Sequence, residues 1–250
     1  MSAHPFPETE PEIKVTPRPD SGLAEVVCKD AGGFFVPLEV GGEAKWSFYD
    51  WPERRLTNVS HTRVAGTIRY RGQDCLEIVD HIISGDDEGW IGRWLYLVSQ
   101  EAVQIVLFDL HDGRGGGKIE EADVTPWPRR LRLGATREGH EEYRCGEEVR
   151  RYAEVQRAAV DGVFEVDLPA GDMLCLRETL WALALGGRGG FTLAELYVAE
   201  NGRSVYFRRF NGPAYHNYDQ LAGNPEREHE GVAWRLWYEC LPDIALASDG

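Results

Sequence analysis

Four predicted strands each place one carboxylate among apolar residues on the same face, because residues two apart on a strand point the same way. The carboxylates are Asp80, Asp109, Glu178 and Glu195, within "DCLEIVDHII", "AVQIVLFDLH", "LCLRETLWA" and "FTLAELYVA". Lining a concave cavity, such a carboxyl would have a raised pKa and be suited to hydrogen bonding or proton transfer. The alternative is that these acids lie near strand ends or pair with an arginine such as Arg209. The sequence leaves both interpretations open.

Asp80 and Asp109 are the best candidates for an acid and base pair, with His111 as a third catalytic participant two residues beyond Asp109. His81 follows Asp80 directly, so the two side chains point to opposite faces. The histidines show no HExxH or HxH spacing, and the five cysteines form no CxxC pair. We therefore predict no metal site, no disulfide framework and no cofactor.

Aromatic residues could form the walls of such a cavity, since the chain has eight tryptophans. Trp234 and Tyr238 share the apolar face of the last predicted strand, and Tyr197 shares a face with Glu195. Trp94 lies on a strand with two apolar faces, so its side stays unassigned. His216, in the polar loop motif "YHNYD", is a further ligand-binding candidate, with a solvated loop as the alternative. For the tryptophans, the alternative is a purely structural core role.

Short apolar or alternating runs, separated by Gly, Asn and Asp turn signals, must position these residues. No repeat of propeller or solenoid length is present. The pattern predicts an all-β fold, a single antiparallel β-barrel or half-barrel of about ten to twelve strands with few short helices. Two segments with helical propensity, "GHEEYRCGEEVRRYAEVQRAAV" and "MLCLRETLWALALG", are predicted to be mainly strand.

Composition sets the expected boundaries. Residues 1–21 are rich in Pro and acidic side chains and predict a disordered tail, residues 22–243 form the single domain, and 244–250 form a C-terminal tail. The longest predicted loops are His111–Pro128 and Asn211–Glu230.

Charge and hydropathy exclude several classes of partner. The chain has 42 acidic and 27 basic residues, a net charge of -15, which would repel nucleic acid and anionic lipid. No apolar run is long enough for a membrane helix, and the N-terminus lacks the basic start and apolar middle of a signal peptide. The sequence therefore predicts a cytoplasmic protein with no nucleic-acid or membrane partner, and leaves the oligomeric state undetermined.

Several motifs resemble a known family in order and spacing. "FFVPLEVGGEAKWSFYDW", "TRVAGTIRYRGQDCLEIVDH", "VFEVDLPAGDMLCLRE" and "AELYVAENGRSVYFRRF" resemble successive elements of the TapB-like bacterial domains of unknown function. That family is similar to lipoprotein-carrier proteins of the bacterial envelope, in which a curved sheet forms a half-barrel. The resemblance implies that the concavity holds a hydrophobic ligand, and it transfers no catalytic residue.

The first functional prediction is binding of a small, largely apolar molecule in the concave cavity, with Trp94, Trp234 and Tyr238 as walls. Asp80, Asp109, Glu178 and Glu195 would orient the ligand. The rival is a cofactor-independent enzyme, a cyclase or hydrolase of secondary metabolism, that uses inward-facing carboxylates as general acid and base. A third class, a structural subunit that covers its sheet edges with a partner, also stays open.

Overall fold

The computed structural model describes residues 13–50, 54–111, 118–145, 148–184, 190–211 and 235–243. The first part of the chain contains β1 (Lys14–Pro17), β2 (Glu25–Val27), the 3-10 turn η1 (Gly32–Phe34), β3 (Glu43–Asp50), β4 (Leu56–Tyr70), β5 (Gln73–Gly85), β6 (Ile91–Val98) and β7 (Ala102–His111). The middle contains β8 (Lys118–Val124), β9 (Trp127–Pro128), β10 (Arg130–Arg132), β11 (Thr136–Cys145) and β12 (Glu148–Leu168). The last part contains β13 (Gly171–Ala184), β14 (Gly190–Ala199), β15 (Ser204–Asn211) and β16 (Arg235–Pro242).

Twelve strands form a closed antiparallel barrel, in the order β12-β11-β8-β7-β6-β5-β4-β3-β16-β15-β14-β13. Hydrogen bonds between β12 and β13 close the ring, so each of the twelve described barrel strands has a barrel strand paired on either side. The predicted all-β barrel is confirmed, in its closed form. The described residues of both segments with helical propensity lie in strands β11, β12 and β13.

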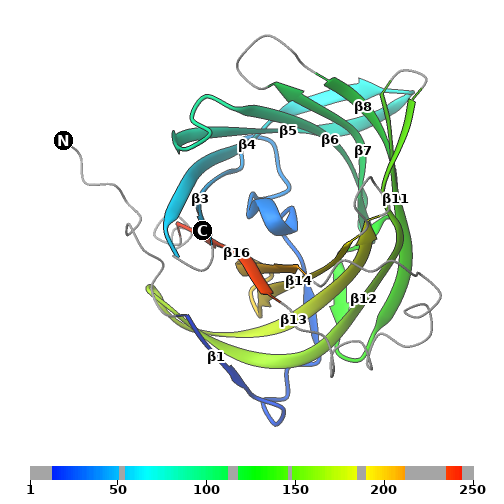
Figure 1. The fold of residues 1–250 in the computed structure, drawn as a ribbon. Coiled ribbons are helices and arrows are strands. Elements are labelled where there is room, and N and C mark those ends of the chain that lie inside the picture. The colour runs from blue at the N-terminus through cyan, green and yellow to red at the C-terminus, as the bar shows by residue number, and fades with distance from the viewer. Residues whose placement is uncertain are drawn as a thin grey trace.

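A segment of the N-terminal region, residues 23–38, enters the barrel, and we call it the plug segment. Figure 1 shows its 3-10 turn η1 enclosed by the ring of strands. Its aromatic and aliphatic side chains pack against the strands, and Phe35 and Val36 are fully buried. Asp30 anchors it, because the Asp30 carboxylate accepts hydrogen bonds from the Ser204 backbone N–H at 2.5 Å and from Ser204 Oγ at 2.7 Å.

Contact with the plug segment defines the inner face of the barrel. Two buried clusters on this face include plug residues, and they contain Val64, Ile78, Trp94, Leu176 and Leu196 from the strands. Two other buried clusters contain no plug residue and lie on the outer face, one around Cys75, Leu95 and Leu107 and one around Tyr197 and Tyr206. The barrel therefore has buried apolar side chains on both faces.

Two predicted irregular segments contain strands. Residues 14–17, assigned to the N-terminal tail, form β1 and pair with residues 164–167 of β12, where Val15 packs on the outer cluster of Tyr197. The predicted loop His111–Pro128 contains β8 and β9, which pair with β7. In both segments tertiary pairing outweighs a local composition that is typical of loops.

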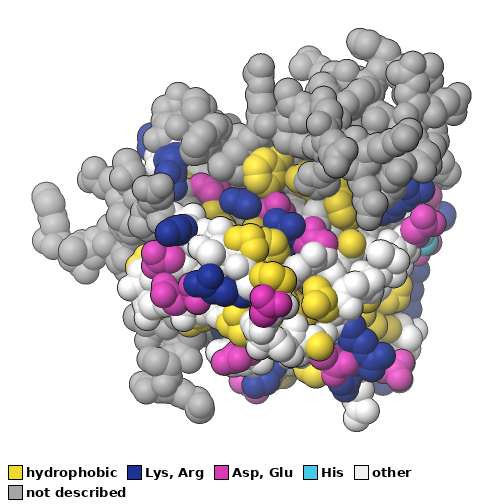
Figure 2. Space-filling model, turned by 90° about the horizontal axis from the view of Figure 1, so that it is seen from below, with side chains coloured by type: hydrophobic (Ala, Val, Ile, Leu, Met, Phe, Trp, Pro, Cys, Tyr) yellow, Lys and Arg dark blue, Asp and Glu magenta, His cyan; other side chains and the backbone are white. Residues whose placement is uncertain are grey.

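The side of the barrel that carries β1, β12 and β13 is mixed in chemistry. Figure 2 shows hydrophobic side chains interspersed with acidic and basic ones on the described part of this surface. One ion pair here joins Arg18 to Glu165 across 2.5 Å. Within the described ranges, no helix has the length and hydrophobicity that a membrane crossing needs.

Candidate functional site

Asp80 lies on the inner face of β5, in line with Leu76 and Ile78 as the sequence predicts. Its side chain is held by two hydroxyls from the neighbouring strand β4. Thr62 Oγ1 donates to Asp80 Oδ1 at 2.5 Å and Ser60 Oγ donates to Oδ2 at 3.1 Å. Trp46 Nε1 in turn donates to Thr62 Oγ1 at 2.8 Å, which fixes the hydroxyl. The carboxylate therefore has a defined position in the wall.

Aromatic rings gather beside this carboxylate. The cross-strand partner of Asp80 is Gly92 on β6, and such partners have Cβ positions roughly 5 Å apart. A Cβ at Gly92 would lie 2.1 Å from Cη2 of Trp94 and 2.5 Å from Cη2 of Trp90, so the two indole rings lean over the glycine. Trp94 also packs against Phe108 at 5.0 Å and against Phe34 of the plug segment at 4.6 Å between ring centroids.

The surroundings of Asp80 favour its neutral form. Burial raises the pKa of Asp80 to about 6, against the hydrogen bonds from Thr62 and Ser60, which lower it. Only 3% of the residue is exposed, so an ionised Asp80 has little contact with water. The group can accept hydrogen bonds when ionised and can exchange a proton near neutral pH.

Glu178 lies on the inner face of β13, with Leu174 and Leu176, but its partners differ from those of Asp80. Trp127 Nε1 donates to Glu178 Oε2 at 2.8 Å, and Arg137 Nε donates to Oε1 at 3.2 Å. Burial raises the pKa of Glu178, and the charge of Arg137 opposes this. The Arg137 guanidinium also lies over the Trp127 ring at 4.3 Å. Pairing with an arginine, one of the two alternatives, therefore applies here, with Arg137 in place of Arg209.

Asp109 lies on the outer face, so the prediction that it shares a face with Ile105 is wrong. The register of β7 against β6 shifts between Leu107 and Ile105, which places a β-bulge at Val106. One extra residue reverses the alternation, so Ile105 joins the inner cluster and Leu107 the outer one. Asp109 is buried beside Arg93, with Nη2 to Oδ2 at 3.7 Å. Asp80 and Asp109 are therefore not brought together.

Glu195 and Tyr197 also lie on the outer face, because Leu196 of the same strand packs inward. Tyr197 OH donates to Glu195 Oε2 at 2.8 Å, and Arg177 Nη1 donates to Glu195 Oε1 at 3.3 Å. Arg208 Nε completes the network at Glu195 Oε2. The predicted apolar face is real, but it is the outer face of the barrel.

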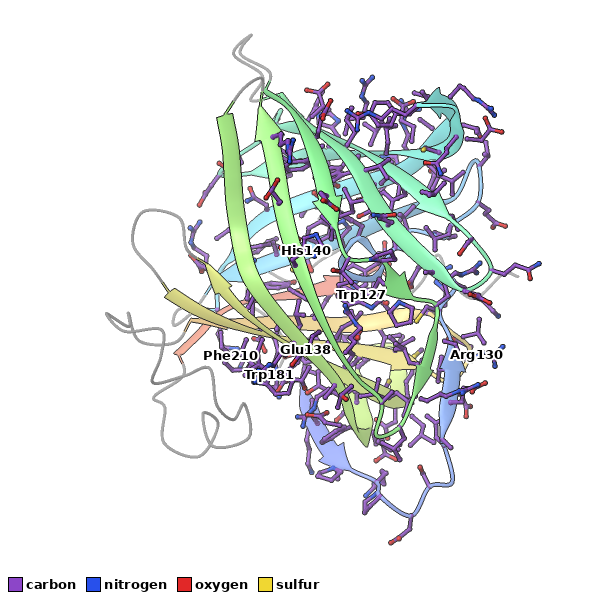
Figure 3. The ribbon with its side chains drawn as sticks, turned by 90° about the vertical axis from the view of Figure 1, so that its right-hand side faces the viewer. Trp127, Arg130, Glu138, His140, Trp181 and Phe210 are labelled. Carbon is purple, nitrogen blue, oxygen red and sulfur yellow. The ribbon has the colours of Figure 1, made fainter. Side chains whose placement is uncertain are left out.

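A row of paired residues extends this outer face across five strands. Figure 3 labels Glu138, Trp181 and Phe210 close to one another in one view. The register links Glu138 to Arg157, Arg157 to Trp181, Trp181 to Leu193 and Leu193 to Phe210. Arg157 Nε lies 3.2 Å from Glu138 Oε1. This row is separate from the inner wall that carries Asp80.

Four predicted site residues lie partly or wholly outside the described part. For two of them only the backbone pairing is described. His111 pairs with Ile91, and Tyr238 pairs with Arg209 on one side and Asp50 on the other. Trp234 and His216 are outside the described residues altogether. Trp94, whose side the sequence does not assign, points to the inner face.

The residues that hold Asp80 were not among the predicted site residues. Ser60 and Thr62 share parity with Val64, so alternation along β4 could have placed their hydroxyls on the inner face. Gly92 between Trp90 and Trp94 was a second signal, since a strand glycine often marks a close approach. Within the described segments, no group of three or more His, Cys, Asp and Glu side chains is placed to hold a metal ion.

Comparison with known proteins gives likenesses of fold. No protein-family model matches the chain, and no curated protein matches it. A putative lipoprotein from Parabacteroides distasonis has a TM-score of 0.43 and 11% identity, over 86% of this chain and 98% of that one. A putative exported protein with YmcC-like fold from Bacteroides fragilis has a TM-score of 0.44 and 14% identity, over 84% of this chain and 97% of that one.

These likenesses bear on two sequence-based predictions. Both similar structures are of bacterial proteins, while the TapB-like name receives no support from them or from a family model. The names of the two proteins, a lipoprotein and an exported protein, contradict the predicted cytoplasmic location.

Proposed function

We propose that the barrel binds a small, largely apolar molecule against the inner wall formed by β4, β5, β6 and β7. One observation carries this proposal: a single buried carboxylate, Asp80, is fixed by two hydroxyls within a wall of aromatic side chains. Apolar walls with few, well-placed polar groups are typical of small-molecule sites. Trp90 and Trp94 would contact the apolar body and Asp80 would orient it.

The acid and base alternative loses the pair that the sequence favours. Such catalysis requires two carboxyls within reach of one substrate, whereas Asp80 is inward and Asp109 outward. The other inward carboxyl, Glu178, is paired with Arg137. We therefore propose binding at this site. The proposed partner is a small hydrophobic molecule.

Tryptophan emission tests the proposal, with a bromine-labelled alkyl alcohol as the quenching probe. We expect saturable quenching of the parent protein and a clearly smaller quenched fraction in Trp94→Phe or Trp90→Phe. Trp127→Phe is the matched control, because Trp127 contacts Glu178 on another part of the inner face. It should keep the quenched fraction of the Trp90 and Trp94 pair.

Quenching that rises linearly without saturation would overturn the proposal. So would saturable quenching that survives in both Trp90→Phe and Trp94→Phe but disappears in Trp127→Phe.

A further inference from the structure

Asp80 differs from the other buried acids near the plug in having no basic partner within salt-bridge distance among the described residues. The charges of His81 and His61 act on the pKa of Asp80, in the lowering direction, from farther away. Asp30 has Arg203 Nε at 3.6 Å, and Glu178 has Arg137 Nε at 3.2 Å. On the outer face, Asp109 and Glu195 also lie beside arginines. Among the described residues, no Lys, Arg or His nitrogen lies within salt-bridge distance of Asp80, whose printed hydrogen-bond partners are the hydroxyls of Ser60 and Thr62.

A buried carboxylate without a counter-charge is unfavourable, because it loses hydration and gains only neutral hydrogen bonds. Each carboxylate oxygen can accept more than one hydrogen bond. Thr62 donates to one oxygen and Ser60 to the other, so accepting capacity remains on both. A positively charged group placed there would supply the missing counter-charge.

The rings beside Asp80 add a second, independent attraction for a cation. Trp90 and Trp94 lie 6.0 Å apart between centroids with their planes tilted by 52°, and Trp94 is tilted against Phe108 at 5.0 Å. Aromatic faces attract cations, tryptophan most strongly, and cages of aromatic rings bind quaternary ammonium groups. The Cη2 atoms of both indoles reach over Gly92, the cross-strand partner of Asp80, so the rings and the carboxylate belong to the same part of the inner wall.

We propose that the ligand of this site carries a cationic nitrogen on its apolar body, with the nitrogen bound between Asp80 and the rings of Trp90 and Trp94. This inference rests on the proposed function and names the chemical class of its ligand. An amphipathic amine or quaternary ammonium compound fits, while a fatty acid with its anionic head would meet the Asp80 charge. Glu178 offers no equivalent site, since Arg137 already neutralises it.

Three probes with the same alkyl tail separate the inference from the proposed function. They are octyltrimethylammonium, octanol and octanoate, titrated calorimetrically at about pH 8, where a carboxyl with a pKa of about 6 is ionised. We expect the parent protein to bind the ammonium probe about tenfold or more tightly than octanol, and octanoate more weakly still. Comparison among probes needs no variant, so it stays informative even if a substitution harms folding.

Two variants localise the preference. Asp80→Asn keeps the shape of the side chain and should retain octanol binding while its preference for the ammonium probe falls to about twofold or less. Asp74→Asn removes one charge from the surface, where Asp74 pairs with Arg69 at 2.9 Å, and should keep the full preference. This control matters because a net charge of -15 attracts any cation weakly.

Each possible result tests one of three claims: the cationic class of the ligand, the proposed function, or the assigned site. If octanol and the ammonium probe bind equally, the cationic class is wrong while the proposed function stands. If no probe binds, the proposed function fails first. If the preference is the same in Asp80→Asn as in the parent, general charge attraction explains it and the assigned site is wrong.

Discussion

Asp80 and Glu178 are both buried acids on the inner face of one barrel, and their surroundings are opposite in charge. Glu178 accepts hydrogen bonds from a guanidinium and an indole N–H, whereas Asp80 accepts them from two hydroxyls. The cross-strand partner of Asp80 is Gly92, over which two tryptophan rings lean. Burial raises the pKa of both carboxyls. The counter-charge therefore distinguishes the two regions: among the described residues, Glu178 has a guanidinium within salt-bridge distance and Asp80 has no basic group at that distance.

Removing Glu178 should have the largest effect, because it leaves the half-buried Arg137 without its salt-bridge partner. Glu178→Ala is expected to lower the free energy of unfolding by about 3 kcal/mol, measured by urea denaturation. Glu138→Ala, whose partner Arg157 lies on the outer face, is the control and should lose much less. Equal losses in the two variants would show that Arg137 does not depend on Glu178 for its counter-charge.

Adding a methyl group beside Asp80 should have the second-largest effect on stability. Gly92→Ala places a Cβ where Trp94 and Trp90 now lie, at 2.1 and 2.5 Å, so both rings must move. We expect a loss of roughly 2 kcal/mol in unfolding free energy and a changed near-ultraviolet circular dichroism signal. Gly66→Ala is matched, since a Cβ there meets no atom within 4 Å. A Gly92→Ala protein with unchanged stability and spectrum would show that the rings do not fill this space.

Neutralising Asp80 should stabilise the protein. The pKa of Asp80 in the folded protein, about 6, lies above the ordinary aspartate value of 3.8, so the folded state binds the proton more tightly than the unfolded state does. The stability of the wild-type protein therefore falls as the pH rises from about 4 to about 7. Asp80→Asn should therefore be more stable than the parent by about 1 to 2 kcal/mol at about pH 7 and nearly equal at about pH 4. A variant that is less stable at the higher pH would place a counter-charge at Asp80.

The smallest expected loss of stability comes from removing the indole N–H that donates to Glu178. Trp127→Phe keeps the aromatic ring under Arg137 but removes the hydrogen bond of 2.8 Å to Glu178. The expected loss of unfolding free energy is about 1 kcal/mol, again from urea denaturation. A loss as large as that of Glu178→Ala would mean that the indole, not Arg137, compensates the carboxylate.

Alternation along strands predicted the barrel and the inward positions of Asp80 and Glu178 correctly, because each lies on a regular stretch of its strand. It failed at Asp109, where one inserted residue at Val106 reverses the faces and leaves no local signal in an apolar run. It failed at Glu195 for another reason. Both faces of that strand pack against apolar side chains, so hydrophobicity alone does not identify the cavity.

The partners of each acid were beyond prediction from local pattern. Arg137 meets Glu178 from 41 positions away and Ser204 meets Asp30 from 174 away, which only the closed topology explains. The plug segment was likewise unexpected. Its residues are mostly apolar and include β2, but nothing local in the sequence shows that the barrel encloses them.

The most direct test of the central claim is a crystal structure of the protein with a bromine-tagged alkyltrimethylammonium probe, read from the anomalous bromine signal. The account predicts a bromine site inside the barrel along the β5 to β7 wall, with the ammonium group next to Asp80 and the rings of Trp90 and Trp94. A bromine site outside the barrel, or an ammonium group beside Glu178 in place of Asp80, would contradict it.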